Sequence, residues 1–425
     1  MNVREIADLS PDDRRAFFDR DAGVESARED VREIIDRVRT EGDVAVRDLT
    51  SEFDDVEVGN LDITDDAARA HEELDEADDE RLDAIREAAA NVREFHERQL
   101  PEDWTEEFDG RELGRRFRPI DSAGVYVPGG EAAYPSSALM GVIPAKVAGV
   151  DHVAVTTPPA EEINPVTLAA IHEAGADTVY QVGGAQGIAA LAYGTESVNA
   201  VDKIVGPGNR WVTAAKAEAR GDVEIDFLAG PSEILVLADE TADPELVAAD
   251  LVAQAEHDAN ASVVAVTADD GLAEEVAAAV DEQAAASERE ETIRAALDNE
   301  ASGILRARSM SEAVLFTEEY AAEHLSIVAE DDESLLDRIT NAGSVFLGPY
   351  SAVAAGDYAA GPNHVLPTNG GAKRYGGLST ETFLRSSTVQ RLDRDALDDV
   401  ADTVTTLAEA EGLSAHAESV RKRFE

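Results

Sequence analysis

The stretch that decides the fold is "SAGVYVPGGEAAYPSSALMGVIPAKVAGVDHVAVTTPP", residues 122–159. It begins with an apolar run of strand length that ends in a glycine turn. A segment of helix length follows, and a second apolar run then ends in proline. Strands made of near-continuous apolar residues are typical of a parallel sheet with helices on both faces. The stretch therefore predicts a β–α–β unit and an α/β fold.

The same alternation of strand and helix patterns continues to about residue 221 and resumes from residue 234 to about residue 347. The first 100 residues have helical patterns, including a long acidic helix predicted from about Asp66 to Leu100, and the last 30 residues return to helix. We predict two doubly wound, incomplete Rossmann-like parallel-sheet domains, with an N-terminal helical segment and an extended helical C-terminal tail.

The composition is that of a globular protein with an unusual charge. The chain has 425 residues, 44% of them hydrophobic, with 36 Lys and Arg against 90 Asp and Glu, a formal net charge of −54. A nucleic-acid binder would carry the opposite sign. The acidic residues are spread along the whole chain, so we interpret them as adaptation to a salt-rich cytoplasm, where dissolved ions screen their repulsion. An acidic protein that binds cations or basic partners is the alternative.

Other features of the sequence exclude several kinds of protein. The chain has no cysteine, which rules out disulfides, zinc sites made of thiolates and a cysteine nucleophile. No apolar run approaches the roughly 20 residues that span a bilayer, and the charged N-terminus does not resemble a secretory signal. We therefore expect a soluble, cytoplasmic protein with no membrane partner.

Three glycine turns follow predicted strands, and each carries or precedes a polar side chain: Tyr126, Gln186 and Asn209. In doubly wound sheets, ligands bind beyond the carboxyl ends of the strands. Glycine lets backbone amides approach a phosphate, and the three side chains could stack on a ring or bond to a ribose or an amide. None of the turns has the G-x-G-x-x-G dinucleotide pattern, so each turn alone has a structural interpretation as well.

Four of the eight histidines, His257, His324, His364 and His416, occupy unusual settings, and each of these four has a carboxylate within seven residues. In addition, Gln254 and His257 are three residues apart near the end of an apolar helix, which places both side chains on one face. Because the chain lacks cysteine, any transition metal must be held by His, Asp, Glu or amide oxygen. The histidines therefore predict either a His and carboxylate metal site or a set of structural histidines.

Ten segments together resemble the histidinol dehydrogenase family, in the family's order and over nearly the whole chain. They include "GVYVPGG", "GGAQGIAALAYGT", "VDKIVGPGN", "AGPSEILVLAD", "DLVAQAEH", "NAGSVFLG", "GDYAAGPNHVLPT" and "AEGLSAH". The resemblance implies an enzyme of histidine biosynthesis that oxidises L-histidinol through L-histidinal to L-histidine, reducing two NAD molecules at a site with one zinc ion per subunit.

The resemblance also implies roles for individual residues. The zinc ligands would be Gln254, His257, Asp357 and His416. The general base pair would be Glu323 and His324, and the NAD contacts would be Tyr126, Gln186 and Asn209. The contacts to substrate would be Ser232, Gln254, His257, His324, Asp357, His364, Glu411 and His416. Glu411 and His416 would come from the other subunit of a homodimer, so the two subunits would share their active sites.

On this basis we predict an N-terminal arm over residues 1–20 and a dimerisation tail over residues 376–425. Residues 21–118 and 236–375 would form the α/β domain with the metal and catalytic residues, and residues 119–235 would form the NAD-binding domain. Two alternatives remain at this point. One is a zinc-dependent hydrolase that uses the Glu323–His324 pair, and the other is a non-catalytic acidic binding protein.

Overall fold

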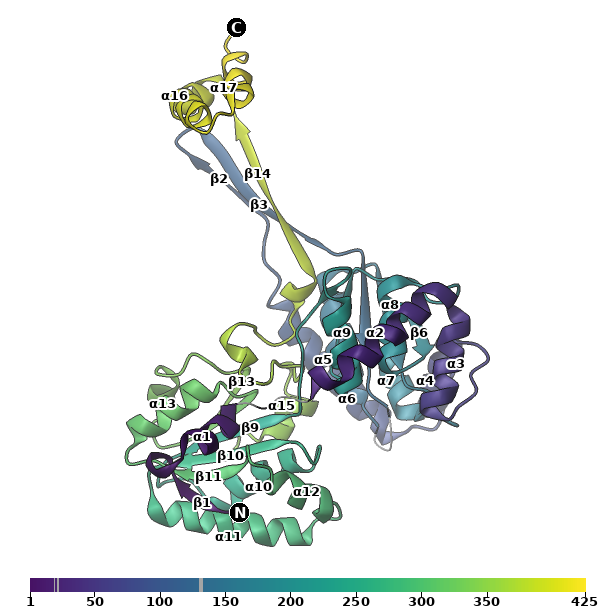
Figure 1. The fold of residues 1–425 in the computed structure, drawn as a ribbon, viewed down its shortest axis with the longest axis vertical. Coiled ribbons are helices and arrows are strands. Elements are labelled where there is room, and N and C mark those ends of the chain that lie inside the picture. Colours follow the sequence, from purple (N-terminus) through teal and green to yellow (C-terminus); the bar gives the residue numbers. More distant parts are fainter. Residues whose placement is uncertain (19, 21–22, 130–132) are drawn as a thin grey trace. The chain divides into compact units, whose positions relative to one another are not determined.

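The computed structural model describes residues 1–18, 20, 23–129 and 133–425, which form two compact units. The main unit consists of Met1–Gln99 and Asp121–Phe383, and the tail unit consists of Leu100–Ile120 and Leu384–Glu425. The predicted α/β class is confirmed, because the main unit contains two parallel sheets with helices packed on them (Figure 1).

The first sheet has six parallel strands. In spatial order they are β1 (Val3–Glu5), β11 (Gly303–Arg306), β10 (Ser262–Thr267), β9 (Glu233–Ala238), β12 (His324–Val328) and β13 (Ser344–Leu347). The predicted N-terminal arm thus contributes an edge strand to this sheet.

Alternate residues of β9 serve two separate cores, as the pleat of a strand requires. Ile234 and Val236 pack with α10 (Pro244–Ala255), α11 (Asp270–Ala286) and α12 (Glu290–Leu297). Leu235 and Leu237 pack on the opposite face, where α1 (Pro11–Phe18), α13 (Met310–Tyr320) and α14 (Asp332–Leu336) contribute apolar side chains. Both faces are therefore covered, which explains the continuous apolar composition of this strand.

The second sheet has five parallel strands. In spatial order they are β6 (Thr178–Gln181), β5 (His152–Thr157), β4 (Ser122–Tyr126), β7 (Lys203–Val205) and β8 (Glu224–Ile225). The crossover helices are α6 (Pro135–Ala148), α7 (Pro165–Ala174), α8 (Gly184–Tyr193) and α9 (Arg210–Ala219). The stretch of residues 122–159 therefore forms the predicted β–α–β unit, although residues 130–132 of its glycine turn lie outside the described residues.

The N-terminal helices pack differently from the predicted domain grouping. They are α2 (Val24–Glu41), α3 (Asp43–Asp54), α4 (Thr64–Glu76) and α5 (Glu80–Glu97). Their most extensive helix contacts are with α6, α7, α8 and α9 of the second sheet. The apolar face of α2 packs into the same core as α8 and α9. The sequence of α2 alone does not indicate which of the two cores this helix joins.

The single acidic helix predicted from Asp66 to Leu100 is wrong, because the structure divides it into α4 and α5. Asp78 adopts a left-handed backbone conformation with φ of 53°, and the side chain of Asp79 accepts a hydrogen bond from the backbone N–H of Arg81. Asp79 is thus the N-cap of a new helix.

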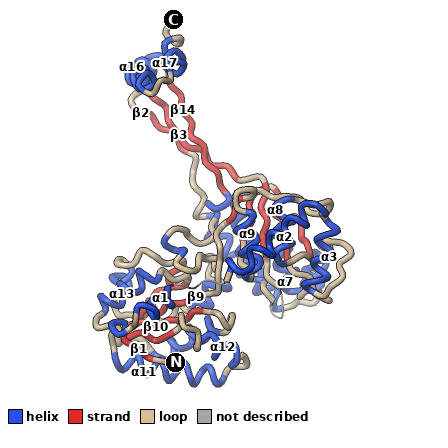
Figure 2. The backbone as a smooth tube through the Cα atoms, viewed as in Figure 1, coloured by secondary structure: helices blue, strands red, loops and turns tan. Residues whose placement is uncertain are grey.

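The tail unit contains a third, antiparallel sheet that the prediction of a purely helical tail missed. Its strands are β14 (Leu384–Leu392), β3 (Arg111–Pro119) and β2 (Trp104–Phe108), in that spatial order (Figure 2). The helices α16 (Arg394–Ala410) and α17 (Ser414–Arg421) follow. Residues 100–120 belong to this unit because β3 pairs with β14 over nine residue pairs.

The remaining short elements of the main unit are η1 (Ile6–Asp8), α15 (Val353–Tyr358), η2 (Gly371–Lys373) and η3 (Thr380–Phe383). Within the described ranges, no helix has both the length and the apolar composition that crossing a membrane requires.

Candidate active site

A cavity of about 1470 Å³ in the main unit collects most of the predicted site residues. Its walls come from segments of both parallel sheets. The predicted residues that line it are Tyr126, Asn209, Ser232, Gln254, His257, Glu323, His324, Asp357 and His364.

The two sheets present opposite strand ends to this cavity. In the second sheet, Tyr126 is the last residue of β4 and Asn209 follows β7, so these residues lie at carboxyl ends as expected. In the first sheet, Ser232 precedes β9 and His324 is the first residue of β12. The reactive groups of this sheet therefore lie at amino ends of strands, contrary to our expectation. The in-register pairing of His324 with Ile234 places the beginnings of β9 and β12 side by side.

The backbone of Glu233 holds both members of the predicted base pair. Its N–H donates to Oε2 of Glu323 at 2.7 Å, and its carbonyl oxygen lies 3.1 Å from Nδ1 of His324. Because a carbonyl can only accept, Nδ1 of His324 carries a proton. The other ring nitrogen, Nε2, is buried without a well-oriented hydrogen-bond partner and lies 3.2 Å from Oδ1 of Asp357.

The electrostatic surroundings of His324 are dominated by two carboxylates. Burial alone would lower the pKa of the imidazole, but the charge of Glu323 and the close approach of the Asp357 and Glu323 carboxylates raise it to about 10. Burial raises the pKa of Glu323. For Asp357, the effect of burial is outweighed by the close contact with His324 and the charge of that imidazole, which lower the pKa. A cation bound by Asp357 would withdraw this stabilisation of the imidazolium and favour neutral His324.

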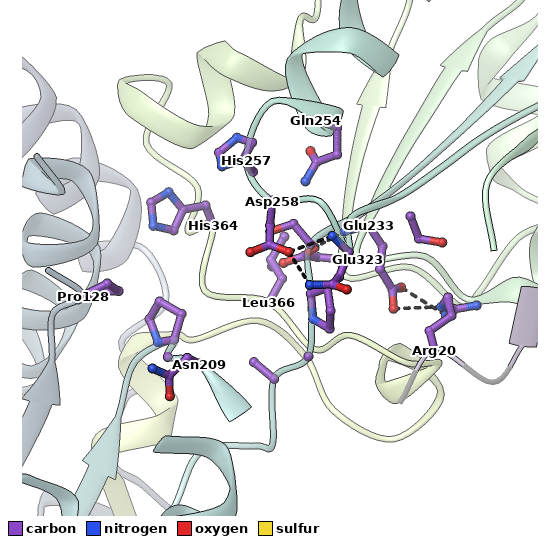
Figure 3. A pocket seen from close by; sticks show the side chains of 18 of the residues that line it. Arg20, Pro128, Asn209, Glu233, Gln254, His257, Asp258, Glu323, His364 and Leu366 are labelled. Carbon is purple, nitrogen blue, oxygen red and sulfur yellow. Dashed lines mark hydrogen bonds and ion pairs between the residues drawn. The ribbon is translucent and has the colours of Figure 1, made fainter. Parts of the chain in front are cut away.

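Three of the four predicted metal ligands lie in this cavity. Gln254 is buried in the last turn of α10, and His257 follows three residues later (Figure 3). Asp357 lies in α15. His257 and Asp357 line the same cavity, and the charge of Asp357 opposes the lowering of the His257 pKa by burial. In the part of the chain that the structure describes, no three His, Asp or Glu side chains alone are arranged to hold a metal ion. The predicted set in this unit is one amide, one imidazole and one carboxylate.

His364, predicted to bind substrate, is fixed between the two sheet segments. Its Nδ1 lies 2.8 Å from the backbone carbonyl of Asp357, and its Nε2 lies 3.3 Å from the hydroxyl of Ser137. Burial lowers the pKa of this imidazole. The ring is therefore favoured in its neutral form.

The predicted NAD contacts have different surroundings. The Tyr126 hydroxyl accepts a hydrogen bond from the N–H of Gly184 at 3.1 Å, and burial raises the pKa of this hydroxyl to about 12. Asn209 caps α9, since its side-chain oxygen accepts from the N–H groups of Trp211 and Val212. A side chain at Gly206 would collide with the carbonyl oxygen of Tyr126, so the turn before Asn209 packs directly on β4.

Gln186 is separate from the described residues that line the cavity. It is buried in α8, and its Nε2 donates to Oδ2 of Asp54 at 3.3 Å. The charge of Asp54 also acts on the Tyr126 hydroxyl, so Gln186 and Tyr126 share one acidic neighbour.

The last two predicted residues lie in the tail unit. Glu411 is the C-cap of α16 and His416 lies in α17, and both are exposed in the single chain.

The sequence analysis missed Arg20 and Glu233, which both line the cavity. Glu233 could have been noticed, because an acidic residue directly before the apolar run "ILVLA" needs a partner if the strand buries it. No local pattern distinguishes Arg20 from the other 30 arginines.

Comparisons with known proteins agree over the whole chain. The sequence model described as Histidinol dehydrogenase matches residues 19–424. The chain is 76% identical to a histidinol dehydrogenase of Haloarcula marismortui over 425 residues, which covers all of both chains. It is 47% identical to that of Geobacillus kaustophilus, over 95% of this chain and 96% of the relative. The crystal structure of histidinol dehydrogenase from Elizabethkingia anophelis superposes with a TM-score of 0.93 at 36% identity, covering 100% of this chain and 98% of that one.

Proposed function

Because this chain belongs to the histidinol dehydrogenase family, we propose that its cavity oxidises L-histidinol through L-histidinal to L-histidine, with NAD as oxidant and one zinc ion per subunit. Its class is that of an oxidoreductase of histidine biosynthesis acting on histidinol. The family and the relatives give no support to the zinc hydrolase alternative. The observation that carries the proposal is the placement of the Glu323–His324 pair beside Asp357 in one cavity.

The donor set fits zinc. Imidazole nitrogen and carboxylate oxygen are ligands that zinc prefers, and Gln254 adds an amide oxygen. His257, Asp357 and Gln254 would hold the ion, with His416 of a second subunit as the fourth ligand. When bound, the ion would hold the imidazole and amine of histidinol, so that its main contribution is to orient the substrate.

In the first oxidation, His324 accepts the proton of the substrate hydroxyl while the carbon that carries this hydroxyl loses a hydride, for which NAD would be the acceptor when bound. Nε2 is the atom that accepts this proton, since the carbonyl of Glu233 keeps the proton of the ring on Nδ1. The product of this step is L-histidinal.

In the second oxidation, Glu323 accepts a proton from the water that adds to the aldehyde. The raised pKa of this buried carboxyl makes it a stronger base than an exposed glutamate. His324 then takes the proton of a diol hydroxyl while the diol carbon loses the second hydride, for which a second NAD molecule would be the acceptor. Ser232 and His364 border the same cavity and would contact the substrate.

For the cofactor, we propose that Tyr126 and Asn209 contact NAD within the cavity and that Gln186 contributes through the cluster with Asp54 and Tyr126. This part of the proposal is supported by the glycine turns at the carboxyl ends of β4, β6 and β7.

The proposal is tested by counting the NADH formed per histidinol. We expect two NADH for each histidinol consumed, because both oxidations occur at the same site. A chelator should lower the rate at least about 100-fold, because without the metal ion the substrate would lose the group that orients it. Added zinc should restore the rate. A yield of one NADH, or full activity after verified removal of metal, would contradict it.

We also propose that the protein works in a cytoplasm rich in salt. The net charge of −54 and the 76% identity to a haloarchaeal relative support this proposal. We expect the melting temperature to rise by at least about 10 °C between 0.1 M and 3 M KCl, because salt shortens the Debye length to about 3 Å at 1 M. Sucrose of equal osmolality is the control for solute effects other than charge screening. Equal melting temperatures at both KCl concentrations would contradict the proposal.

A further inference from the structure

Arg20 and Glu233 form a buried ion pair next to the Glu323–His324 pair. Nε and Nη2 of Arg20 donate to the two carboxylate oxygens of Glu233 at 2.8 and 3.0 Å, and both side chains are almost fully buried (Figure 3). Arg20 also donates to the backbone carbonyls of Phe17 and Tyr320, and its guanidinium lies 3.9 Å from the centroid of the Tyr320 ring. The orientation of Arg20 is therefore determined from several sides.

The side chain of Glu233 is fixed by hydrogen bonds, and its backbone binds the two residues of the base pair. One carboxylate oxygen also accepts the N–H of Asn369 at 2.6 Å, so three donors fix this side chain. The backbone of the same residue donates to Glu323 and accepts from His324. A displacement of Glu233 would thus move both members of the pair.

We propose that Arg20 and Glu233 are positioning residues, which hold the backbone of Glu233 where it fixes the orientation of Glu323 and the ring tautomer of His324. This inference rests on the proposed roles of Glu323 and His324. It assigns to the N-terminal segment, which carries none of the reacting groups, a direct effect on the rate of both oxidations.

The energetics of burying charge favour a positioning role for Arg20 and Glu233 over a role in fold stability alone. Burying two charges costs several kcal/mol per ion before their attraction offsets it, and apolar residues of similar size often stabilise a fold at least as well. Here the cavity already contains the buried carboxyl of Glu323 beside Glu233, which adds repulsion. Stability alone therefore does not require a charged pair at this place.

The test compares four variants of the full-length protein with zinc and NAD in high KCl: Arg20→Lys, Arg20→Met, Glu233→Gln, and Arg20→Met combined with Glu233→Gln. We expect kcat to fall about 10-fold in Arg20→Lys, which keeps the charge but loses the planar fork. In Arg20→Met we expect about 100-fold, the typical effect of misplacing catalytic groups by about 1 Å. KM for histidinol should stay within about twofold, because the substrate contacts are unchanged.

The double variant separates positioning from stability. It has no unpaired buried charge, and the amide oxygen introduced by Glu233→Gln can still accept the Asn369 N–H. We expect its melting temperature to recover at least half of the loss seen in Arg20→Met, while kcat stays about 100-fold low. Recovery of kcat together with stability would overturn the inference.

Arg14→Lys is the matched control, since Arg14 lies on the same segment and pairs with the exposed Glu319. It should leave kcat within about twofold. A crystal structure of the double variant gives a readout that does not depend on turnover. We expect the contact from the backbone nitrogen of residue 233 to Oε2 of Glu323 to lengthen by about 0.5 Å or more. If this contact keeps its length, the inference is overturned, whether or not the protein oxidises histidinol. If the wild type forms no NADH from histidinol, only the proposed function is overturned.

Discussion

Replacing Glu323 with Gln leaves the oxidation of histidinol within about threefold of wild type and lowers the oxidation of histidinal at least about 10³-fold. The amide keeps the shape of the side chain and an oxygen that accepts the N–H of Glu233, so the fold and His324 stay in place. It cannot accept a proton, however, and only the second oxidation requires a base for water.

The measurement is the rate of NADH formation in single turnovers, with histidinol or histidinal as the starting substrate. With histidinol the variant should release one NADH per molecule instead of two. Glu330→Gln is a matched control, because Glu330 is exposed just after β12, the strand that begins at His324. Equal loss of both oxidations would show that Glu323 and His324 do not divide the work as proposed.

Two inactive variants should regain activity when mixed, if the tail unit completes the site of a second subunit. Asp357→Ala and His416→Ala should each lose at least about 10³-fold in rate, because each lacks a proposed zinc ligand. In a mixed dimer, one of the two sites combines an intact Asp357 from one chain with an intact His416 from the other. After denaturation and joint refolding, roughly a quarter of wild-type activity should return, since about half of the dimers are mixed.

The matched control is a mixture of Asp357→Ala with His257→Ala. Both changes lie in the main unit, so no combination of these chains contains an intact site, and activity should stay at background. Activity is measured as NADH formation, with size-exclusion chromatography to count subunits. If the first mixture stays as inactive as the control, His416 does not act across subunits.

The sequence predicted the class of the fold because the central strands of both parallel sheets, such as β9, β10 and β4, are buried almost throughout. Runs such as "ILVLA" and "SVVAV" need no partner information to be recognised as buried strands. It failed for the packing of α2 to α5, because an amphipathic helix shows that it has an apolar face but not which core receives it. The strand β14 was missed for a related reason, since most of its residues are exposed and it lacks a continuous apolar run.

For the site, the resemblance to a known family supplied residue positions that spacing alone left open. Nine predicted residues line one cavity, although they come from segments far apart in the chain. The residues behind the site could not be predicted in this way. The contact between Arg20 and Glu233 joins positions 213 residues apart, and only the folded chain shows that Glu233 presents its backbone to two side chains at once.

The pairing of β3 with β14 has a consequence for biosynthesis. Pro119 pairs with Leu384 and Arg111 with Leu392, so the antiparallel ladder closes a loop of more than 260 residues. During translation, β3 leaves the ribosome long before its partner strand exists, while the intervening segment can already begin to fold. Contacts of such large sequence separation form late, because the entropy of closing the loop must be overcome first. We therefore expect this ladder to be the last part of the chain to close, and any assembly that depends on the tail to wait for release of the complete polypeptide.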